Sequence, residues 1–184
     1  MNKKVEKTVC YLCGCTDYKF RKGKVRDNDK LKILQCNSCG LVFLSSQVHI
    51  QEHHYEKSGM HDRQMPDVDS WLKDTKVDDE RRYQLLKQKI TNKNVLDFGC
   101  GAGGFLALAR NSADKVNGIE LEESLQPSFN DRGLNVFTNL QEAIKSGEKW
   151  DLITAFHVVE HLADPITVLQ KLSNLIISVE GGGV

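Results

Sequence analysis

The pattern of hydrophobic and polar positions changes along the chain near Asn94. Beyond this residue, short apolar runs alternate with stretches in which apolar residues recur at helical spacing, so strands and helices are predicted in turn. The predicted strands span 95–98, 116–120, 134–137 and 151–156, and the predicted helices span 104–110, 124–130, 141–145 and 166–177. Such alternation through short loops favours parallel strands with helices on both faces. Residues 91–184 are therefore expected to form an α/β domain with about four strands.

The first 48 residues show a different pattern. Short β-like runs at 18–21, 31–34 and 41–44 are separated by Gly, Asp and Asn residues, which favour turns. We expect a small β-rich module over residues 1–48.

Residues 49–90 are predicted to connect these two parts. From Ser45 to about Lys76 the sequence is polar and weakly periodic, which indicates a connector with a few short helical turns. From Asp79 to Ile90, apolar side chains gather on one helical face and leave Lys and Arg side chains for solvent. This segment is expected to be a helix that docks on the α/β domain.

The charge of the chain is unevenly distributed. The 184 residues hold 25 Lys and Arg against 25 Asp and Glu, a formal net charge of zero. Residues 1–50 hold ten basic and four acidic side chains, so this part carries +6 and the rest −6. This division supports two regions of different chemistry. No apolar stretch is long enough for a bilayer and the start lacks the apolar run of a secretory signal, so we expect a cytoplasmic protein without membrane contact.

Five of the six cysteines lie in the first 39 residues, and four of these five form two Cys-x-x-Cys-Gly sequences. Two residues between a pair of thiolates allow a tight turn that aims both sulfurs at one Zn²⁺, and four such ligands complete a tetrahedron. A thioredoxin-like redox pair would explain one such sequence but not two. The sequence therefore predicts a structural zinc ribbon with Cys15 outside the ligand set. The predicted ligands are Cys10, Cys13, Cys36 and Cys39.

A basic zinc module is also compatible with nucleic-acid binding. The scaffold interpretation, with solvated lysines around a metal, is favoured because the module shows no interleaving of aromatic and basic residues that would indicate a base-stacking surface. A second metal site at His49, His53, His54 and His61 is not favoured either, since their spacing fits no ligand motif.

A glycine-rich loop follows the first predicted strand of the α/β domain. Gly99, Gly101 and Gly103 have no side chains, so the backbone can approach a flat or charged ligand closely. The spacing Gly99-x-Gly101-x-x-Gly104 also fits the dinucleotide fingerprint, which keeps NAD open as a ligand.

Two carboxylates favour a different ligand. Asp97 comes two residues before the first glycine, where its charge would repel a pyrophosphate but hold the cationic amino end of a methionine-like ligand. Glu120 ends the next strand, where it can accept hydrogen bonds from two ribose hydroxyls. The ligand predicted from these positions combines adenosine with an amino acid.

These residues resemble two motifs of class I S-adenosylmethionine (SAM) dependent methyltransferases, in Asp97-x-Gly99-x-Gly101-x-Gly103 and Gly118-Ile119-Glu120. Residues 151–165 resemble the segment after the fourth strand of that family. With its zinc module, the chain resembles the zinc-binding subgroup that includes C-methyltransferases of nucleotide-linked deoxysugars. The resemblance implies a Rossmann-like sheet, SAM and Zn²⁺ as cofactors, and a small-molecule acceptor such as a sugar nucleotide.

The resemblance also implies cofactor contacts from the loop, the strand ends and the connector. These residues are Asp97, Gly99, Cys100, Gly101, Gly103, Glu120, Leu121, Phe156, His157, Tyr55 and Asn139. Among them, Asn139 is a candidate for the adenine edge, and Tyr55 resembles a connector tyrosine that closes over the cofactor. Cys100 is expected to be a small buried side chain rather than a nucleophile, since no base or cation accompanies it in sequence.

The candidate catalytic residues are His157, Glu160 and His161, which follow the fourth predicted strand on the cofactor side of the sheet. A near-neutral imidazole can remove a proton from the acceptor, and Glu160 can orient that imidazole. Equally, Glu160 and His161 can hold the loop by hydrogen bonds while Asp164 caps the next helix. The sequence leaves both interpretations open.

The sequence stops near a turn that in the methyltransferase family leads into a fifth strand. Four strand-helix units fit into residues 94–184, so we expect an unpaired sheet edge, self-association through it, and a chain too short for a complete acceptor site. Two alternatives remain. One is a noncatalytic zinc module that binds SAM or a partner, and the other, less favoured, is an NAD-dependent oxidoreductase.

Overall fold

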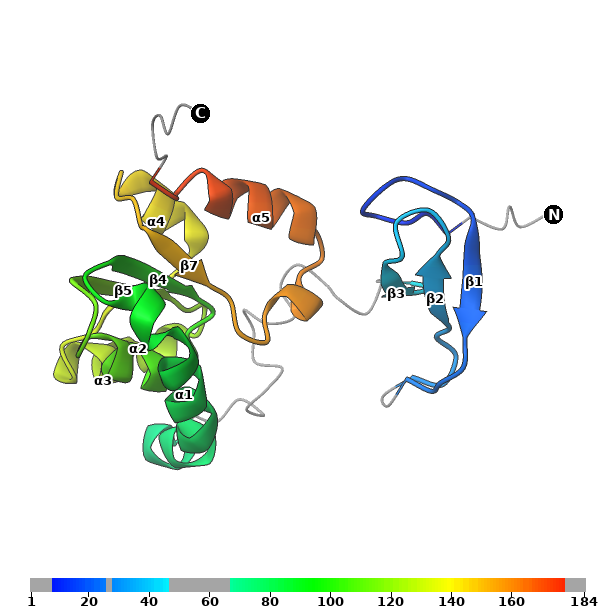
Figure 1. Ribbon diagram of the computed structural model, residues 1–184. Helices are drawn as coiled ribbons and strands as arrows, with labels where there is room; N and C mark the ends of the chain where they lie inside the picture. The colour runs from blue at the N-terminus through cyan, green and yellow to red at the C-terminus, as the bar shows by residue number, and fades with distance from the viewer. Residues whose placement is uncertain (1–7, 26–27, 47–66, 178–184) are drawn as a thin grey trace. The chain divides into compact units, whose positions relative to one another are not determined.

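The computed structural model describes residues 8–25, 28–46 and 67–177 (Figure 1). The chain divides into two compact units, which we call the N-terminal unit (Met1–Gln51) and the C-terminal unit (Glu52–Val184). Among the residues that the structure describes, no helix is both long and apolar enough to cross a membrane.

The N-terminal unit is a three-stranded antiparallel sheet in the order β1-β2-β3. Its strands are β1 (Tyr18–Arg21), β2 (Ile33–Cys36) and β3 (Val42–Leu44). The middle strand starts two residues later than the predicted run at 31–34 and ends on a cysteine. The buried side chains here are Cys10, Leu34, Cys36 and Phe43, a core too small to stabilise a domain by apolar burial alone.

The C-terminal unit contains a parallel sheet in the order β6-β5-β4-β7. Its strands are β4 (Asn94–Phe98), β5 (Lys115–Ile119), β6 (Asn135–Phe137) and β7 (Leu152–Thr154). The prediction of an α/β fold with a Rossmann-like sheet of four parallel strands is confirmed.

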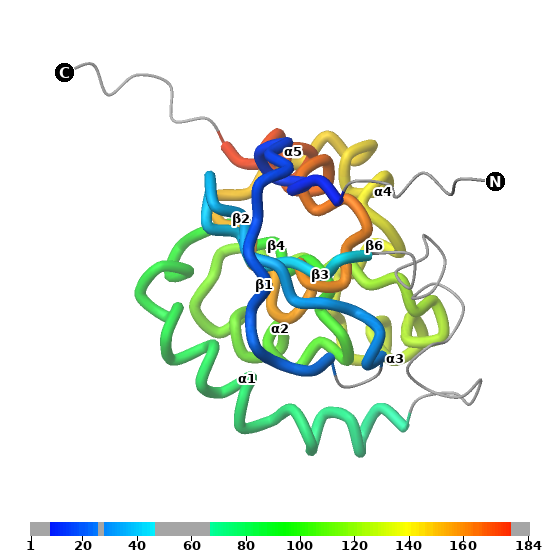
Figure 2. Tube along the Cα trace, turned by 90° about the vertical axis from the view of Figure 1, so that its right-hand side faces the viewer, coloured from blue at the N-terminus to red at the C-terminus, as the bar shows by residue number. Residues whose placement is uncertain are grey.

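Helices cover both faces of this sheet (Figures 1 and 2). One face carries α4 (Leu140–Lys145) and α5 (Pro165–Ser173). The other carries α1 (Val68–Ile90), α2 (Gly104–Ala109) and α3 (Gln126–Asp131), and two short 3₁₀ turns, η1 (Glu123–Leu125) and η2 (Val159–His161), follow strands β5 and β7. The carboxyl ends of the parallel strands therefore meet at one edge, where such folds bind ligands.

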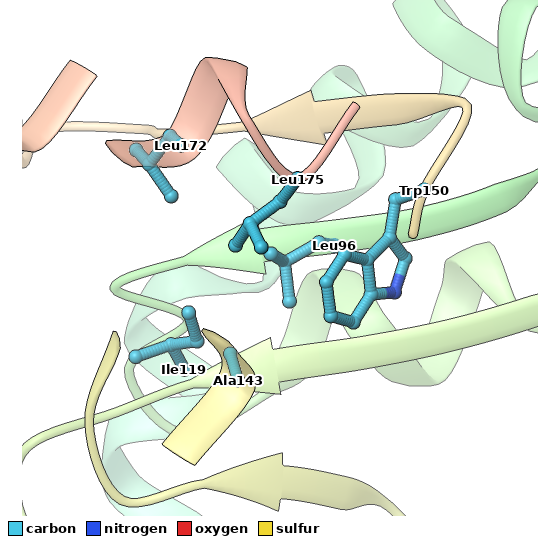
Figure 3. Packing of buried hydrophobic residues seen from close by; sticks show 6 residues of the cluster. All are labelled: Leu96, Ile119, Ala143, Trp150, Leu172 and Leu175. Atoms are coloured by element: carbon cyan, nitrogen blue, oxygen red, sulfur yellow. The ribbon is translucent and has the colours of Figure 1, made fainter. Parts of the chain in front are cut away.

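Trp150 is the largest side chain in the core beneath α4 and α5 (Figure 3). It packs with Leu96 of β4 and Ile119 of β5, and its indole Nε1 donates a hydrogen bond of 3.1 Å to Oδ1 of Asn117. Both Trp150 and Asn117 are fully buried, so the hydrogen bond satisfies the indole N–H inside an apolar layer.

The helix α1 is longer than the sequence predicts. The prediction of a connector up to Lys76 and a helix only from Asp79 is wrong, because α1 begins at Val68. Asp67 caps it by accepting a hydrogen bond from the backbone N–H of Ser70. The first half of this helix packs Val68 and Trp71 against the apolar core and also places the polar residues Thr75 and Asp79 at a cavity wall. Its inward face therefore lacks the regular hydrophobic spacing that the prediction relied on.

The predicted helix at 166–177 also differs from the structure, since α5 ends at Ser173. The chain then turns back toward Trp150, whose backbone N–H donates to the carbonyl of Leu175 and whose carbonyl accepts from Ile177. A parallel bridge between Trp150 and Ile176 forms there. The apolar residues at 175–177 thus start strand-like pairing instead of extending the helix.

Candidate functional site

A cavity of about 370 Å³ lies at the carboxyl ends of β4, β5 and β7 in the C-terminal unit. Its walls come from the glycine loop after β4, the segment after β5, the loop after β7, and helix α1. This is the edge of a parallel α/β sheet at which ligands bind. The cavity is large enough for part of a nucleoside-sized ligand.

The glycine loop adopts backbone conformations that favour glycine. Gly99, Gly101 and Gly103 have φ angles of 74°, 53° and 77°. The backbone N–H of Gly99 donates to the carbonyl of Ile119, which holds the loop against β5. An added Cβ on Gly99 would overlap Val158, and one on Gly101 would lie 3.2 Å from the ring of Trp71. Both positions therefore need glycine for close packing as well as for backbone geometry.

Gly103 plays a different part. It is the N-cap residue of α2 and does not line the cavity. An added Cβ there would lie 3.0 Å from Leu134 and 3.3 Å from Phe129, both in the core. The structure thus places Gly103 against α3 and the segment before β6, not at the ligand side of the loop.

Asp97 is the next-to-last residue of β4, lies at the cavity wall and is 3% exposed. The hydroxyl of Thr154, its neighbour on β7, donates a hydrogen bond of 2.6 Å to Oδ1. Burial raises the pKa of Asp97 to about 7, although this hydrogen bond opposes the shift. An isolated buried carboxylate is costly, and a cationic ligand group in the cavity would stabilise its charged form.

Glu120 holds the loop and the segment after β5 together. Its Oε2 accepts a hydrogen bond of 2.8 Å from the backbone N–H of Gly101, and its Oε1 accepts one of 3.1 Å from the backbone N–H of Glu122. The carboxylate is thereby fixed at the cavity wall and still has lone pairs for ligand hydroxyls. Leu121 follows it, lines the cavity, and is 40% exposed.

The loop after β7 brings two histidines to the cavity. Phe156, His157 and His161 line it, and His157 has a φ of 55°, a left-handed conformation that is uncommon outside glycine. Nδ1 of His157 lies 3.5 Å from Oε1 of Glu160, and both side chains are exposed. Glu160 itself does not line the cavity, so it reaches the site only through His157.

Helix α1 supplies a wall that the sequence analysis missed. Trp71, Thr75, Asp79 and Arg82 line the cavity from one stripe of the helix. The stripe mixes aromatic, hydroxyl and charged side chains, so it carries no apolar signal. These four residues are spaced as on one face of a helix just upstream of the glycine loop, and this spacing could have indicated the wall from the sequence.

The three remaining predicted residues, Cys100, Asn139 and Tyr55, have different outcomes. Cys100 lines the cavity but is buried, and desolvation raises its thiol pKa well above the usual value, which makes it a poor nucleophile. Asn139 caps α4 by accepting a hydrogen bond of 3.0 Å from the backbone N–H of Glu142, and it does not line the cavity. Tyr55 and the histidines at 49–61 lie outside the described residues.

The N-terminal unit brings four cysteine sulfurs together. The Sγ atoms of Cys10, Cys13, Cys36 and Cys39 all lie within 4.8 Å of one another. Cys10 and Cys39 are 3.6 Å apart, and Cys13 and Cys36 are 3.5 Å apart. A tetrahedron of sulfurs at the Zn–S distance of about 2.3 Å has edges of about 3.8 Å, so the donor set fits Zn²⁺.

The four thiols differ in pKa: backbone amides favour the charged form of Cys36, whereas desolvation and the neighbouring thiols raise the pKa of Cys39 to about 12. Hydrogen bonds from the amides of Cys39 and Ser38 contribute to lowering the pKa of Cys36 to about 6. Gly14 and Gly40, which follow the two pairs, have φ angles of 73° and 78°. Cys15 is not in the sulfur cluster, and its Sγ accepts a hydrogen bond from the backbone N–H of Asp17.

Comparison with known protein families identifies a match over residues 68–182 to a methyltransferase domain. The chain belongs to this family. The matched region contains the whole cavity and every element of the C-terminal unit that the structure describes.

Curated relatives carry the name ubiquinone biosynthesis O-methyltransferase. One from Coxiella burnetii (strain Dugway 5J108-111) is 34% identical over 106 residues, which cover 52% of this chain and 44% of the relative. One from Neisseria meningitidis serogroup C is 33% identical over 98 residues, covering 47% of this chain and 41% of the relative. The chain thus spans less than half the length of these relatives.

A solved structure with the same fold is the plantazolicin methyltransferase BpumL in complex with SAH. It is 20% identical, with a TM-score of 0.50, and the match covers 70% of this chain and 57% of that one. This structural similarity supports the assignment of the methyltransferase fold to this chain.

Proposed function

We propose that the C-terminal unit binds SAM and takes part in methyl transfer to a small-molecule acceptor. The observation that carries this proposal is Asp97, a carboxylate that is 3% exposed and that lies at a cavity wall beside the glycine loop. The amino group of the methionine part of SAM is the kind of cation that would stabilise it. A dinucleotide pyrophosphate would instead meet repulsion.

The other cavity residues fit the rest of SAM. Glu120 has lone pairs for the ribose hydroxyls, and Leu121 offers an apolar surface to the adenine. Arg82 offers guanidinium N–H groups to the methionine carboxylate. SAM supplies an electrophilic methyl group on its sulfonium. The protein holds the two ends of the ligand and excludes water from between them.

His157 and His161 are the candidate proton acceptors at the open side of the cavity. The left-handed backbone at His157 fixes where its ring leaves the chain, and Glu160 lies close enough to orient that ring. A neutral imidazole would take the proton from an acceptor hydroxyl or carbon while the acceptor is methylated.

The acceptor is proposed as a sugar nucleotide or another small metabolite. The zinc module supports the sugar assignment through its resemblance to that subgroup, whereas the curated relatives are named for ubiquinone biosynthesis. A hydroxyl or carbon of such an acceptor has to lose a proton when it is methylated, and the two histidines at the cavity can take that proton.

The N-terminal unit is proposed to hold one structural Zn²⁺ through Cys10, Cys13, Cys36 and Cys39. Four thiolates leave no open coordination position, so the metal would stabilise the fold rather than take part in the reaction. The small core of this unit makes such a staple necessary.

Transfer of a labelled methyl group tests the activity. The full chain is incubated with methyl-labelled SAM and a panel of nucleotide sugars and phenolic acceptors, and label is followed into product. Label in an acceptor, lost in Asp97→Asn, supports the proposal. Tight SAM binding without transfer to any acceptor would favour the alternative, a noncatalytic module that binds SAM.

A further inference from the structure

Helix α1 carries two ion pairs of the same spacing in consecutive positions, and they differ in burial. Asp78 and Arg81 lie 3.0 Å apart with side chains 55% and 62% exposed. Asp79 and Arg82 lie 3.2 Å apart with side chains only 8% and 15% exposed. The exposed pair is an ordinary surface interaction of little energetic weight. The buried pair lines the cavity and needs a separate explanation.

Burial of an ion pair is weak evidence for a stabilising role, because desolvation offsets the attraction and apolar residues would pack as well. The Asp79 carboxylate is nevertheless held tightly. An added Cβ on Gly104 would overlap its Oδ2, so the first residue of α2 has to be glycine for the carboxylate to fit between the two helices. The same packing explains why Gly104, the last glycine of the dinucleotide-like spacing, is a glycine, and this explanation requires no bound ligand.

Asp79 and the ring of Phe156 together confine Arg82. Nη1 of Arg82 donates to Oδ1 of Asp79, and its guanidinium carbon lies 4.8 Å from the centroid of the Phe156 ring. Phe156 is itself fixed by an edge contact with Phe105, 5.2 Å between centroids. Among the residues that the structure describes, Asp79 is the one hydrogen-bond acceptor of Arg82, so further N–H groups of the guanidinium remain for a ligand.

The charges at this end of the cavity match an amino acid. Arg82 and Asp79 act in opposite directions on the pKa of Asp97, which shows that all three groups share one electrostatic environment. A ligand with an ammonium and a carboxylate can place the first at Asp97 and the second at Arg82. A nucleoside without an amino acid engages neither group.

We propose that Asp79 is a positioning residue, which holds the Arg82 guanidinium over Phe156 so that its remaining N–H groups receive the carboxylate of the amino acid part of the cofactor. This inference rests on the proposed binding of SAM. It assigns to the Asp79–Arg82 pair the selection of ligands that carry the amino acid over ligands that carry only the adenosine part.

Two effects compete when Asp79 is removed. The loss of its negative charge lessens repulsion of the ligand carboxylate, which favours binding. The loss of the hydrogen bond lets the long Arg82 side chain turn toward solvent, and its rotamer freedom must then be given up on binding. Because Arg82 hydrogen-bonds the ligand carboxylate only while its N–H groups face the cavity, we expect the second effect to dominate.

The test compares two ligands by calorimetric titration of the full chain. S-adenosylhomocysteine (SAH) carries the amino acid, and 5′-methylthioadenosine lacks it. In Asp79→Ala we expect SAH affinity to fall about tenfold and methylthioadenosine affinity to change less than about twofold. In Asp79→Asn, which keeps an oxygen acceptor for Arg82, we expect most of the SAH affinity to return.

Further variants keep the test decisive if Asp79→Ala folds poorly. Arg82→Gln should lose SAH affinity by about 10–100-fold and spare methylthioadenosine. The double variant Asp79→Ala/Arg82→Gln should lose no more SAH affinity than Arg82→Gln alone. Asp78→Ala, at the exposed pair, is the matched control and should bind both ligands as the parent does.

Several outcomes would overturn the positioning role. Equal losses for both ligands in Asp79→Ala would show a structural role only. A loss in Asp79→Asn as large as in Asp79→Ala would show that the Asp79 charge contacts the ligand directly. Absence of SAH and methylthioadenosine binding by the parent chain would instead reject the cofactor proposal itself.

Discussion

The two units differ in what holds them together. In the N-terminal unit, the buried residues that the structure describes are two cysteines, a leucine and a phenylalanine. In the C-terminal unit, three apolar clusters surround a four-stranded sheet, and that core supports two buried carboxylates, Asp79 and Asp97, at a cavity. The first unit is therefore expected to depend on the proposed zinc ion for its stability, whereas the second has an apolar core that keeps two carboxylates buried at the cavity.

Removal of the metal is expected to give the largest difference in stability between the two units. Cys36→Ser, or treatment with a strong chelator, is expected to unfold the N-terminal unit, because structural zinc supplies roughly 10 kcal/mol or more of apparent folding energy. Both tryptophans, Trp71 and Trp150, lie in the C-terminal unit, so tryptophan fluorescence follows that unit alone. Its melting curve should stay unchanged while zinc and the amide signals of the N-terminal unit are lost.

Cys15→Ser is the matched control, since Cys15 lies outside the sulfur cluster. It should keep one equivalent of zinc. Loss of zinc in Cys15→Ser but not in Cys36→Ser would show that the ligand set is wrong.

The next largest effect is expected in the core of the C-terminal unit. Trp150→Ala removes a fully buried indole and leaves Oδ1 of Asn117 without its donor, so it should lower the free energy of unfolding by about 3–5 kcal/mol. Denaturant unfolding followed by Trp71 fluorescence measures this loss. Zinc content should be unaffected, and a parallel loss of zinc would contradict the division into two units.

Asp97→Asn should weaken the ligand site and strengthen the fold. Because the pKa of Asp97 is raised to about 7 from its usual value near 3.8, the folded state retains a proton between these pH values that the unfolded state has lost. Parent stability therefore falls as pH rises through this window. The variant, which cannot ionise, should melt at a similar temperature near pH 4 and at a higher temperature, by roughly 10 °C or more, near pH 8.

The same variant should bind SAH at least about tenfold more weakly near pH 8, because the amide cannot pair with the ligand ammonium. Parent affinity should fall on acidification below about pH 7 as Asp97 gains its proton. A variant less stable than the parent at high pH would show that Asp97 is structural.

The smallest effect is expected at Asn139. Asn139→Ala removes the cap of α4 and should lower stability by about 1 kcal/mol. SAH affinity should not change, since Asn139 does not line the cavity. A loss of affinity with unchanged stability would support the contact with adenine that the sequence resemblance implies.

Local patterns predict much of this molecule. The alternation of apolar runs yields the four parallel strands, and the two Cys-x-x-Cys-Gly sequences yield the sulfur cluster. Each depends on residues close together in sequence, where turn chemistry and periodicity act directly. The motif residues Asp97 and Glu120 reach the cavity for the same reason, since strand ends of a parallel sheet share one edge.

The rest depends on contacts between distant segments. Arg82 and Asp79 line the cavity only because α1 packs across α2. Since both side chains are polar, a search for hydrophobic periodicity does not detect this part of the helix. Gly103 serves the core because α3 and Leu134 lie against it, which no spacing within the loop reveals. A role for Tyr55, self-association and a cytoplasmic location stay predictions.

Calorimetric titration of the full chain with SAH and with NAD tests the central claim most directly. The account predicts saturable one-to-one binding of SAH, weakened at least about tenfold in Asp97→Asn, and no binding of NAD at the same concentrations. Binding of NAD without binding of SAH would contradict it.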